Sequence, residues 1–416
     1  MRKILIIKFS AIGDVVESLP VAAALKELYK DGCEITWITK KCHMCLLENN
    51  EFIDKIICFE DIKSTYFRLL KEIFRNYNKN FHTNQKFISS CIQKIFSKLP
   101  SIKILRGYRF DLVLDLQGSI ESSVISMMCN AKYRLIPSFI NNGVERFSTK
   151  INTDFISKQR VESYLDVVRF LGYSGNKINF GWNFSDEELM YVDEFLKEHG
   201  IIKGDRYIVM AIGTTWDTKN YPVVHWAKIV NYLYEKDICV VIIGGMNENK
   251  YIEELDKIIS KDRYVNLVGL TDLRQMAIVI SRSTVVVSGD SGPMHMAYSL
   301  GRFVIALMGP TDPVQFGPYG NKNKILIDMP LIAAIYCFFI GLFLVLLSFI
   351  FQLSPGWKEL FLIVTVLNYG FVISAPPLFT PFPDKIYRID GRCNEILPHH
   401  NLILSVSNQN YYLSHF

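Results

Sequence analysis

A short polar segment in the second half of the chain carries residue types that bind sugars and phosphates. The sequence SGDSG at residues 288–292 follows four β-branched residues, TVVV, and precedes an apolar helical pattern. This order predicts a strand, a tight turn and a helix, with Asp290, Ser291 and Gly292 at the carboxyl end of the strand. A carboxylate and free backbone N–H groups at that place can receive a sugar hydroxyl or a phosphate. Turns of this kind also occur in α/β folds that bind nothing there.

Hydroxyl groups and a lysine follow another predicted strand. Residues 213–219 read GTTWDTK directly after an apolar run. The hydroxyls of Thr214 and Thr215 and the ammonium group of Lys219 suit a diphosphate, which needs hydrogen-bond donors and positive charge. A lone lysine in a loop is more often only solvated, so this segment predicts a phosphate site only in combination with others.

A third polar segment, SAIGD at residues 10–14, follows the first apolar run of the chain. Lys3 to Phe9 predicts a buried strand, and a helix is expected from about Val15 to Tyr29. Gly13 allows a sharp turn off the strand, and Asp14 is expected to cap the helix. The segment lacks the G-x-G-x-x-G pattern of dinucleotide-binding folds.

The elements that must position these segments alternate between strand and helix patterns. Strands are predicted at residues 33–38, 54–59, 111–116, 207–212, 238–243, 284–288 and 303–308, and helices at residues 160–171, 223–235, 249–259 and 273–280. Such alternation predicts parallel sheets with helices on both faces. Because glycines and polar residues crowd residues 172–186, we expect the linker between two α/β domains there.

Several motifs together resemble one known family. They are DSGPMH at residues 290–295, GPTDP at 309–313 and FGPYG at 316–320. The chain is similar, from Met1 to about Met329, to glycosyltransferase family 9, the heptosyltransferases that build the lipopolysaccharide inner core. The resemblance implies the GT-B architecture, in which two Rossmann-like doubly wound domains face a cleft. Residues 1–175 would form the acceptor-side domain and residues 176–328 the nucleotide-sugar-binding domain.

The resemblance also implies roles for individual residues. Asp14 would act as the general base that takes the proton of the attacking sugar hydroxyl. Lys219, with Thr214 and Thr215, would stabilise the departing diphosphate, and Asp290 would orient the donor sugar. Further donor-side residues implied are Glu248 at the ribose, Thr271 near the adenine, Ser291, Gly292 and His295, and the acceptor-side residues are Ser10, Gly13, Gln117 and Gly118. A lone helical histidine such as His295 is also often only structural.

The amino-acid composition of the chain limits the binding partners and cofactors that we expect. The net charge of +5 does not indicate a nucleic-acid-binding protein, and nine scattered cysteines favour reduced thiols over a disulfide framework. Residues 73–110 contain no acidic residue, which predicts either a solvated pair of helices or a basic surface for anionic lipid headgroups or a phosphorylated acceptor. We expect no cofactor and no metal, because no metal-spaced cluster of His, Asp or Glu is present.

The sequence departs from the family after Asp328. Residues 329–353 contain no charge and are long enough to span a bilayer, and residues 360–378 form a weaker apolar run. We expect a transmembrane hairpin over residues 329–378, against the alternative of a buried core helix, and residues 379–416 show no motif. Residues 329–353 would anchor the protein at the cytoplasmic face of the inner membrane.

The combined interpretation is an inverting glycosyltransferase that transfers heptose from ADP-heptose to a lipid-linked oligosaccharide acceptor. Two alternatives remain from the sequence. One is a noncatalytic, membrane-attached protein that binds a sugar nucleotide, and the other is a glycosyltransferase that uses a different nucleotide sugar. The retained Asp14, Lys219 and Asp290 count against the first alternative.

Overall fold

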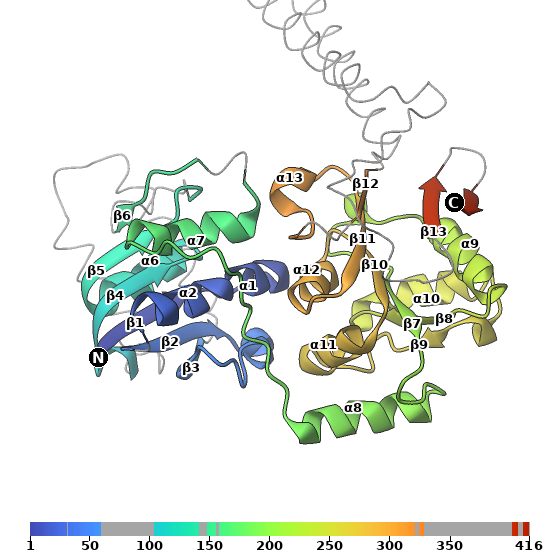
Figure 1. Ribbon diagram of the computed structural model, residues 1–416, viewed down its shortest axis with the longest axis horizontal. Coiled ribbons are helices and arrows are strands. Elements are labelled where there is room, and N and C mark those ends of the chain that lie inside the picture. Colours follow the sequence, from blue (N-terminus) through green and yellow to red (C-terminus); the bar gives the residue numbers. More distant parts are fainter. Residues whose placement is uncertain are drawn as a thin grey trace, which may run out of the picture.

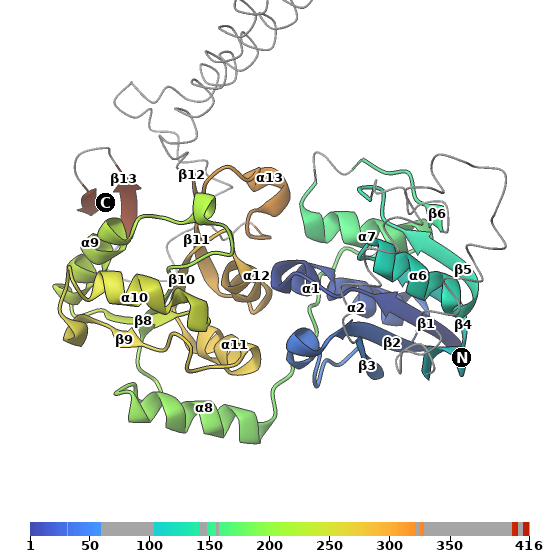
Figure 2. The same ribbon diagram turned by 180° about the vertical axis from the view of Figure 1, so that it is seen from behind.

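The chain folds into two lobes that meet along one seam (Figures 1 and 2). The structure is a computed structural model, and it describes residues 1–30, 32–59, 104–140, 148–154, 158–320, 324–327, 402–406 and 411–415. Each lobe is built on one parallel sheet. Helices α1 and α12 lie between the two sheets, where the lobes touch (Figure 1).

The first lobe contains a sheet of six parallel strands. Its strands are β1 (Arg2–Ile7), β2 (Cys33–Lys40), β3 (Lys55–Phe59), β4 (Arg109–Asp115), β5 (Asn130–Ile136) and β6 (Thr149–Lys150). The order in space is β3-β2-β1-β4-β5-β6. The helices of this lobe are α1 (Ile12–Ser18), α2 (Pro20–Leu28), α6 (Ile120–Met128) and α7 (Arg160–Phe170), with the 3-10 helix η1 (Lys41–Leu46) after β2.

The second lobe repeats this arrangement with the order β12-β11-β10-β7-β8-β9, again in parallel pairs. Its strands are β7 (Tyr207–Ala211), β8 (Cys239–Ile243), β9 (Val265–Asn266), β10 (Val285–Gly289), β11 (Phe303–Met308) and β12 (Lys324–Ile327). Its helices are α9 (Val223–Tyr234), α10 (Asn249–Leu255), α11 (Leu273–Arg282), α12 (Gly292–Ser299) and α13 (Pro313–Phe316), with the 3-10 helices η3 (Asp217–Lys219), η4 (Met246–Glu248) and η5 (Lys261–Arg263).

The two sheets have the same topology. In each, the first strand lies beside the fourth, so the strand order reverses between β1 and β4 in the first lobe and between β7 and β10 in the second. Doubly wound sheets bind ligands at the carboxyl ends of the strands at this reversal. The expected α/β fold with parallel sheets is therefore confirmed, and the segments after β1, β4, β7 and β10 are those that can build a site.

The start of the first lobe differs from the expectation in two details. The single helix expected from Val15 to Tyr29 is two helices, because Pro20 has no N–H and begins α2. Helix α1 also begins earlier, with Ala11 in the capping position. Asp14 therefore lies inside the first turn, where its side chain accepts a hydrogen bond from the backbone N–H of Ala11 at 3.1 Å. The expectation that Asp14 is the capping residue was wrong.

The connection between the lobes runs below both sheets (Figure 1). After α7, residues 171–185 contain no helix or strand, and α8 (Asp186–Glu198) begins with Ser185 as its capping residue. The guanidinium group of Arg274 on α11 pairs with Glu188 of α8 at 2.6 Å and donates to the backbone oxygen of Glu48 in the first lobe at 2.8 Å. This nearly buried arginine ties both lobes to the connecting helix.

One apolar core extends across the seam. It joins residues of the first lobe, such as Ile4 of β1 and Leu25 of α2, to residues of the second lobe such as Met294 and Val304, all of them fully buried. The burial of so much apolar surface holds the lobes against each other in this arrangement.

Three predictions fall on residues that the structure does not describe. The basic segment is described only from residue 104 onward, and the apolar runs at residues 329–353 and 360–378 lie outside the described residues. Among the described residues, no helix has the length and apolar character that crossing a membrane requires. Near the carboxyl terminus, β13 (Leu402–Val406) and β14 (Tyr411–His415) form a separate antiparallel pair.

Candidate active site at the seam between the lobes

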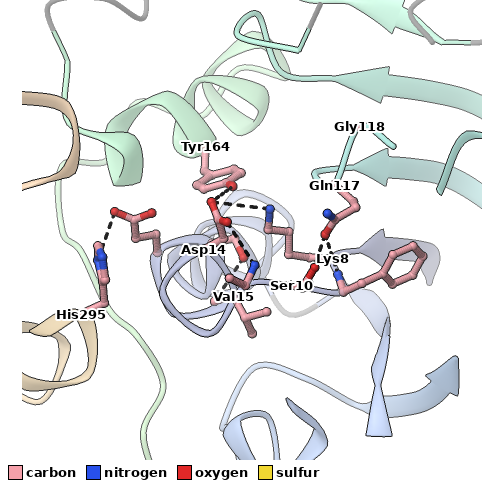
Figure 3. A network of polar contacts seen from close by, with 12 residues as sticks. Lys8, Ser10, Asp14, Val15, Gln117, Gly118, Tyr164 and His295 are labelled. Atoms are coloured by element: carbon pink, nitrogen blue, oxygen red, sulfur yellow. Dashed lines mark hydrogen bonds and ion pairs between the residues drawn. The ribbon is translucent and has the colours of Figure 1, made fainter. Parts of the chain in front are cut away.

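The first-lobe half of the site is centred on the carboxylate of Asp14 (Figure 3). The hydroxyl of Tyr164 on α7 donates to Asp14 Oδ1 at 3.1 Å, and the ammonium group of Lys8 lies 3.7 Å from the same oxygen. Lys8 follows β1 and is 4% exposed, whereas the Asp14 side chain is 40% exposed. The carboxylate is thus held in place from three sides but still reaches solvent.

The environment of Asp14 favours its charged form. Although burial acts against the carboxylate, Lys8, the Ala11 N–H and Tyr164 together hold the pKa of Asp14 below its ordinary value. Burial is also the main cause that lowers the pKa of Lys8. At neutral pH Asp14 is therefore an ionised carboxylate with a neighbouring cation, ready to receive a proton from a hydroxyl.

The loop after β4 supports the segment that carries Asp14. Gln117 Oε1 accepts hydrogen bonds from the backbone N–H groups of Phe9 at 2.9 Å and Ser10 at 3.1 Å. The fully buried Asp115 in turn accepts hydrogen bonds from the backbone N–H groups of Gln117 and Gly118, at 3.1 and 2.9 Å. Burial raises the pKa of Asp115 to about 6. The expected acceptor-side residues Ser10, Gln117 and Gly118 thus form one scaffold.

Gly118 has a backbone conformation that suits glycine. Its φ is +65°, and a Cβ at this position would lie 2.5 Å from Ile140 Cδ1. The close approach lets the loop turn tightly under the site.

The second-lobe half of the site is built around Asp290, at the turn from β10 to α12. The ammonium group of Lys219 pairs with Asp290 Oδ2 at 2.6 Å. Thr214, after β7, is nearly buried; its N–H donates to Asn220 Oδ1 at 2.7 Å and its hydroxyl to the backbone oxygen of Trp216 at 2.8 Å. The structure therefore brings Lys219 and Asp290 together from two loops that are separate in sequence, at the reversal of the second sheet.

His295 joins the two halves. Its Nε2 lies 3.6 Å from Asp290 Oδ1 in its own lobe, and its Nδ1 lies 3.3 Å from Glu17 Oε1 in the first lobe and 3.2 Å from the hydroxyl of Tyr298. Burial opposes the charged imidazolium, but Glu17 and Asp290 together raise the pKa of His295 to about 10. His295 is therefore a cation placed between two carboxylates, and it links helix α1 to helix α12.

Two glycines permit this close contact. A Cβ on Gly13 would lie 2.6 Å from His295 Cδ2, and a Cβ on Gly292 would lie 2.8 Å from Ile12 Cγ2. Only hydrogen atoms fit at these positions while α1 and α12 stay in contact. Gly13 and Gly292 thus set the distance between the two halves of the site.

The remaining expected donor-side residues lie at the carboxyl edge of the second sheet. The side chain of Glu248 packs against the backbone of Gly213, since a Cβ there would lie 2.3 Å from Glu248 Cγ. Ser291 shares a 2.9 Å hydrogen bond with Ser288, and Thr215 is exposed. Thr271 is partly buried, and its hydroxyl oxygen has no hydrogen-bond partner in the described part of the chain.

Sequence reasoning missed the residues that complete the site. They are Lys8, Glu17 and Tyr164, which contact Asp14 or His295. A charged Lys8 next to an apolar strand was a signal that could have been noticed, because a lysine is rarely buried without a partner. Glu17 and Tyr164 gave no comparable signal, since each lies in an ordinary helical pattern.

The described ranges of the chain contain no group of three or more His, Cys, Asp and Glu residues that could hold a metal ion. Positive side chains at the seam include Lys8, Lys219 and His295. Such cations can stabilise an anion that develops between the lobes.

Comparison with known proteins places this arrangement among sugar transferases. The sequence profile of glycosyltransferase family 9 (heptosyltransferase) matches residues 100–332, more than half of the chain. The chain is 25% identical over 344 residues to the Campylobacter coli lipopolysaccharide heptosyltransferase 1, covering 78% of this chain and 89% of that protein. It is 22% identical over 329 residues to the Haemophilus influenzae lipopolysaccharide core heptosyltransferase OpsX, covering 78% and 84%.

Solved structures show the same fold. A family 9 glycosyltransferase from Veillonella parvula superposes with a TM-score of 0.63 at 20% identity, over 79% of this chain and 87% of that one. The Escherichia coli heptosyltransferase WaaC with ADP gives a TM-score of 0.58 at 20% identity, over 78% and 93%. The likeness supports a GT-B-like fold with two facing α/β lobes.

Proposed function

The chain belongs to glycosyltransferase family 9 and is a glycosyltransferase, and we propose that it transfers heptose from ADP-heptose to a lipid-linked acceptor of the lipopolysaccharide core, with inversion at the anomeric carbon. The observation that carries this proposal is the meeting of two half-sites at the seam. A partly exposed carboxylate, Asp14, comes from the first lobe, and the Lys219–Asp290–His295 group comes from the second.

The donor would bind to the second lobe. Lys219 offers a positive charge to the diphosphate, and it would exchange part of its pairing with Asp290 for the phosphate oxygens. Asp290 could then accept a hydrogen bond from a hydroxyl of the donor sugar. The choice of ADP-heptose is supported by the relatives: a second structure of the similar WaaC enzyme holds ADP-2-deoxy-2-fluoro heptose.

The reaction would proceed by direct displacement. An acceptor hydroxyl attacks the anomeric carbon and transfers its proton to Asp14, a new carbon–oxygen bond forms, and the bond from the anomeric carbon to the diphosphate breaks. Lys219 would stabilise the negative charge on the departing ADP. Contact between the lobes would exclude water, so that transfer to the acceptor is favoured over hydrolysis.

The acceptor is proposed to be lipid-linked, at the cytoplasmic face of the inner membrane. The names of the relatives support a lipopolysaccharide acceptor. The uncharged run at residues 329–353 and the basic stretch at residues 73–110 support a site close to a lipid surface.

The test is a transfer assay with the full chain, ADP-heptose and lipopolysaccharide that lacks heptose. We expect ADP release that depends on the acceptor, together with a product heavier by one heptose. Thermal stabilisation by ADP-heptose, but not by UDP- or GDP-sugars, would support the donor assignment. Stabilisation and transfer with a different nucleotide sugar only would show that the donor is wrong, and no transfer with any donor would contradict the proposal.

A further inference from the structure

Arg160 is a charged residue beside the site that has no role in the reaction described above. It is the first residue of α7, one helical turn before Tyr164, which contacts Asp14. Residues four apart on a helix share one face, so Arg160 and Tyr164 both point toward the same region of the first lobe. The guanidinium group lies over the ring of Phe139 at 4.1 Å and over the ring of Phe316 at 4.8 Å.

The guanidinium group of Arg160 contacts two aromatic rings, and one of its nitrogen atoms lacks a partner in the ranges that the structure describes. The Nη1 atom of Arg160 is buried and has no hydrogen-bond partner there. A guanidinium group carries five N–H donors and stays charged at every physiological pH. Removing such a charge from water is costly unless an anion compensates, and two aromatic faces compensate only in part.

The charge of Arg160 reaches the groups around Asp14. Burial is the main cause that lowers the pKa of Lys8, and the nearby Arg160 adds to this effect. Burial also raises the pKa of Glu17, and Arg160 acts in the opposite direction. Lys8 and Arg160 therefore create a positive region on the acceptor side, next to the carboxylates of Asp14 and Glu17.

We propose that Arg160 binds an anionic group of the acceptor, a carboxylate or a phosphate, beside the hydroxyl that Asp14 deprotonates. The planar fork of a guanidinium group matches either anion with two parallel hydrogen bonds. The contacts with the rings of Phe139 and Phe316 restrict the orientation of that fork. The inference rests on the proposed function, and it adds a chemical class to the acceptor.

The two rings come from different lobes. Phe139 follows β5 in the first lobe and packs edge-on against Tyr164 at 5.2 Å, whereas Phe316 ends α13 in the second lobe. The guanidinium group is thus held in this orientation only when the lobes are together. Recognition of the acceptor anion would therefore occur in the same arrangement that brings Asp14 to the donor.

The experiment compares two variants and three forms of one acceptor. The full chain, Arg160→Gln and Arg160→Lys are assayed for transfer from ADP-heptose to heptose-free lipopolysaccharide that is untreated, methyl-esterified at its carboxylates, or treated with phosphatase. Arg206→Gln serves as the charge-matched control, because Arg206 is exposed at the opposite end of the second sheet.

With the untreated acceptor, we expect Arg160→Gln to lower kcat/KM for the acceptor about 10- to 100-fold, the effect of one charge-assisted hydrogen-bonded pair, with an unchanged KM for the donor. Arg160→Lys should recover part of this loss, since it keeps the charge but not the fork. The treatment that neutralises the recognised group should remove most of the difference between Arg160→Gln and wild type. If methyl esterification removes this difference, the recognised group is a carboxylate. If phosphatase treatment removes it, the recognised group is a phosphate.

The inference is overturned if Arg160→Gln loses the same factor with all three acceptors, which is the behaviour of a residue that only packs between rings. It is also overturned if Arg160→Gln transfers like Arg206→Gln. A wild-type chain that transfers to none of the acceptors contradicts the proposed function itself, and the inference with it.

Discussion

Asp14 and Asp290 both lie at the strand reversal of a doubly wound sheet, Asp14 after the first strand of one sheet and Asp290 after the fourth strand of the other, and their surroundings differ. Each follows the strand of its sheet at which the strand order reverses, Asp14 after β1 and Asp290 after β10. The side chain of Asp14 is 40% exposed and lies 3.7 Å from Lys8, whereas that of Asp290 is 9% exposed and pairs with Lys219 at 2.6 Å.

The difference in exposure and pairing suits the two carboxylates to different roles. Burial opposes both carboxylates, but neighbouring donors hold the pKa of each below its ordinary value. Asp290 is engaged by Lys219 on one oxygen and by His295 near the other, so it is suited to hold groups in place. Asp14 keeps contact with solvent and is suited to receive a proton. Related folds and identical residue types therefore give two carboxylates with different environments, which under the proposed function would serve chemistry and binding respectively.

Removing the carboxylate of Asp14 should have the largest effect. We expect Asp14→Ala to reduce turnover by more than about 100-fold, the scale of the loss of a general base, while the affinity for ADP-heptose stays near wild type. Turnover measured at saturating donor, with donor affinity from calorimetry, tests this. Wild-type turnover in the variant would show that Asp14 is not the general base and that the two aspartates do not have the separate roles described.

Neutralising Lys219 should show the opposite pattern. We expect Lys219→Gln to weaken donor binding about 10- to 100-fold, because a charge-assisted contact to the diphosphate is lost and Asp290 is left without its partner. Lys236→Gln, an exposed lysine at the end of α9, is the matched control. Calorimetric titration with ADP-heptose measures the effect. Equal donor affinity in both variants would remove Lys219 from the donor site.

The charged state of His295 predicts a pH dependence of stability. Its pKa is about 10 in the folded protein against an ordinary value near 6.5, so between these values the folded chain holds a proton that the unfolded chain releases. The contribution is complete below about pH 6.5 and is lost as the pH rises toward 10, with a slope of at most about 1.4 kcal/mol per pH unit.

Denaturant unfolding of wild type and His295→Gln between pH 7 and pH 9 measures this slope. The wild-type free energy of unfolding should fall more steeply with pH than that of the variant. Parallel curves would mean that His295 is neutral at the seam.

The smallest expected effect is that of the hydrogen bond from Tyr164 to Asp14. Tyr164→Phe removes a donor that favours the carboxylate, so the pKa of Asp14 should rise and the acid limb of the pH profile of kcat/KM should move to higher pH. At neutral pH we expect a change of only a few-fold, the scale of one hydrogen bond. An unshifted acid limb would show that another group controls it.

Much of the fold and the centre of each half-site could be predicted from the sequence. Polar residues in the loops that follow apolar runs, such as Asp14, Lys219 and Asp290, fall near the carboxyl ends of parallel strands, where such sheets gather their functional residues. This inference needs only the local order of apolar and polar residues in the sequence. The strands β5, β6, β9 and β12 were missed: β6 and β9 have two residues each and are too short to show a period, and β5 and β12 carry charged residues among their apolar ones.

The partners of these residues could not be predicted, because they depend on which helices pack together. Tyr164 is 150 residues from Asp14 in the chain, and Glu17 meets His295 only because α1 and α12 touch. Close packing of that kind depends on Gly13 and Gly292, whose role is visible only once the facing side chains are known.

The central claim is that the two half-sites act as one site because α1 and α12 are in contact. Gly13→Ala tests it most directly, because the added Cβ would meet the buried ring of His295 at 2.6 Å, while alanine by itself favours a helix. Gly107→Ala, at an exposed position of the first lobe, is the control.

We predict that Gly13→Ala keeps its donor affinity and its first-lobe helix but loses about 10- to 100-fold in turnover, the cost of misplacing reacting groups by about 1 Å. Wild-type turnover in Gly13→Ala would contradict the account.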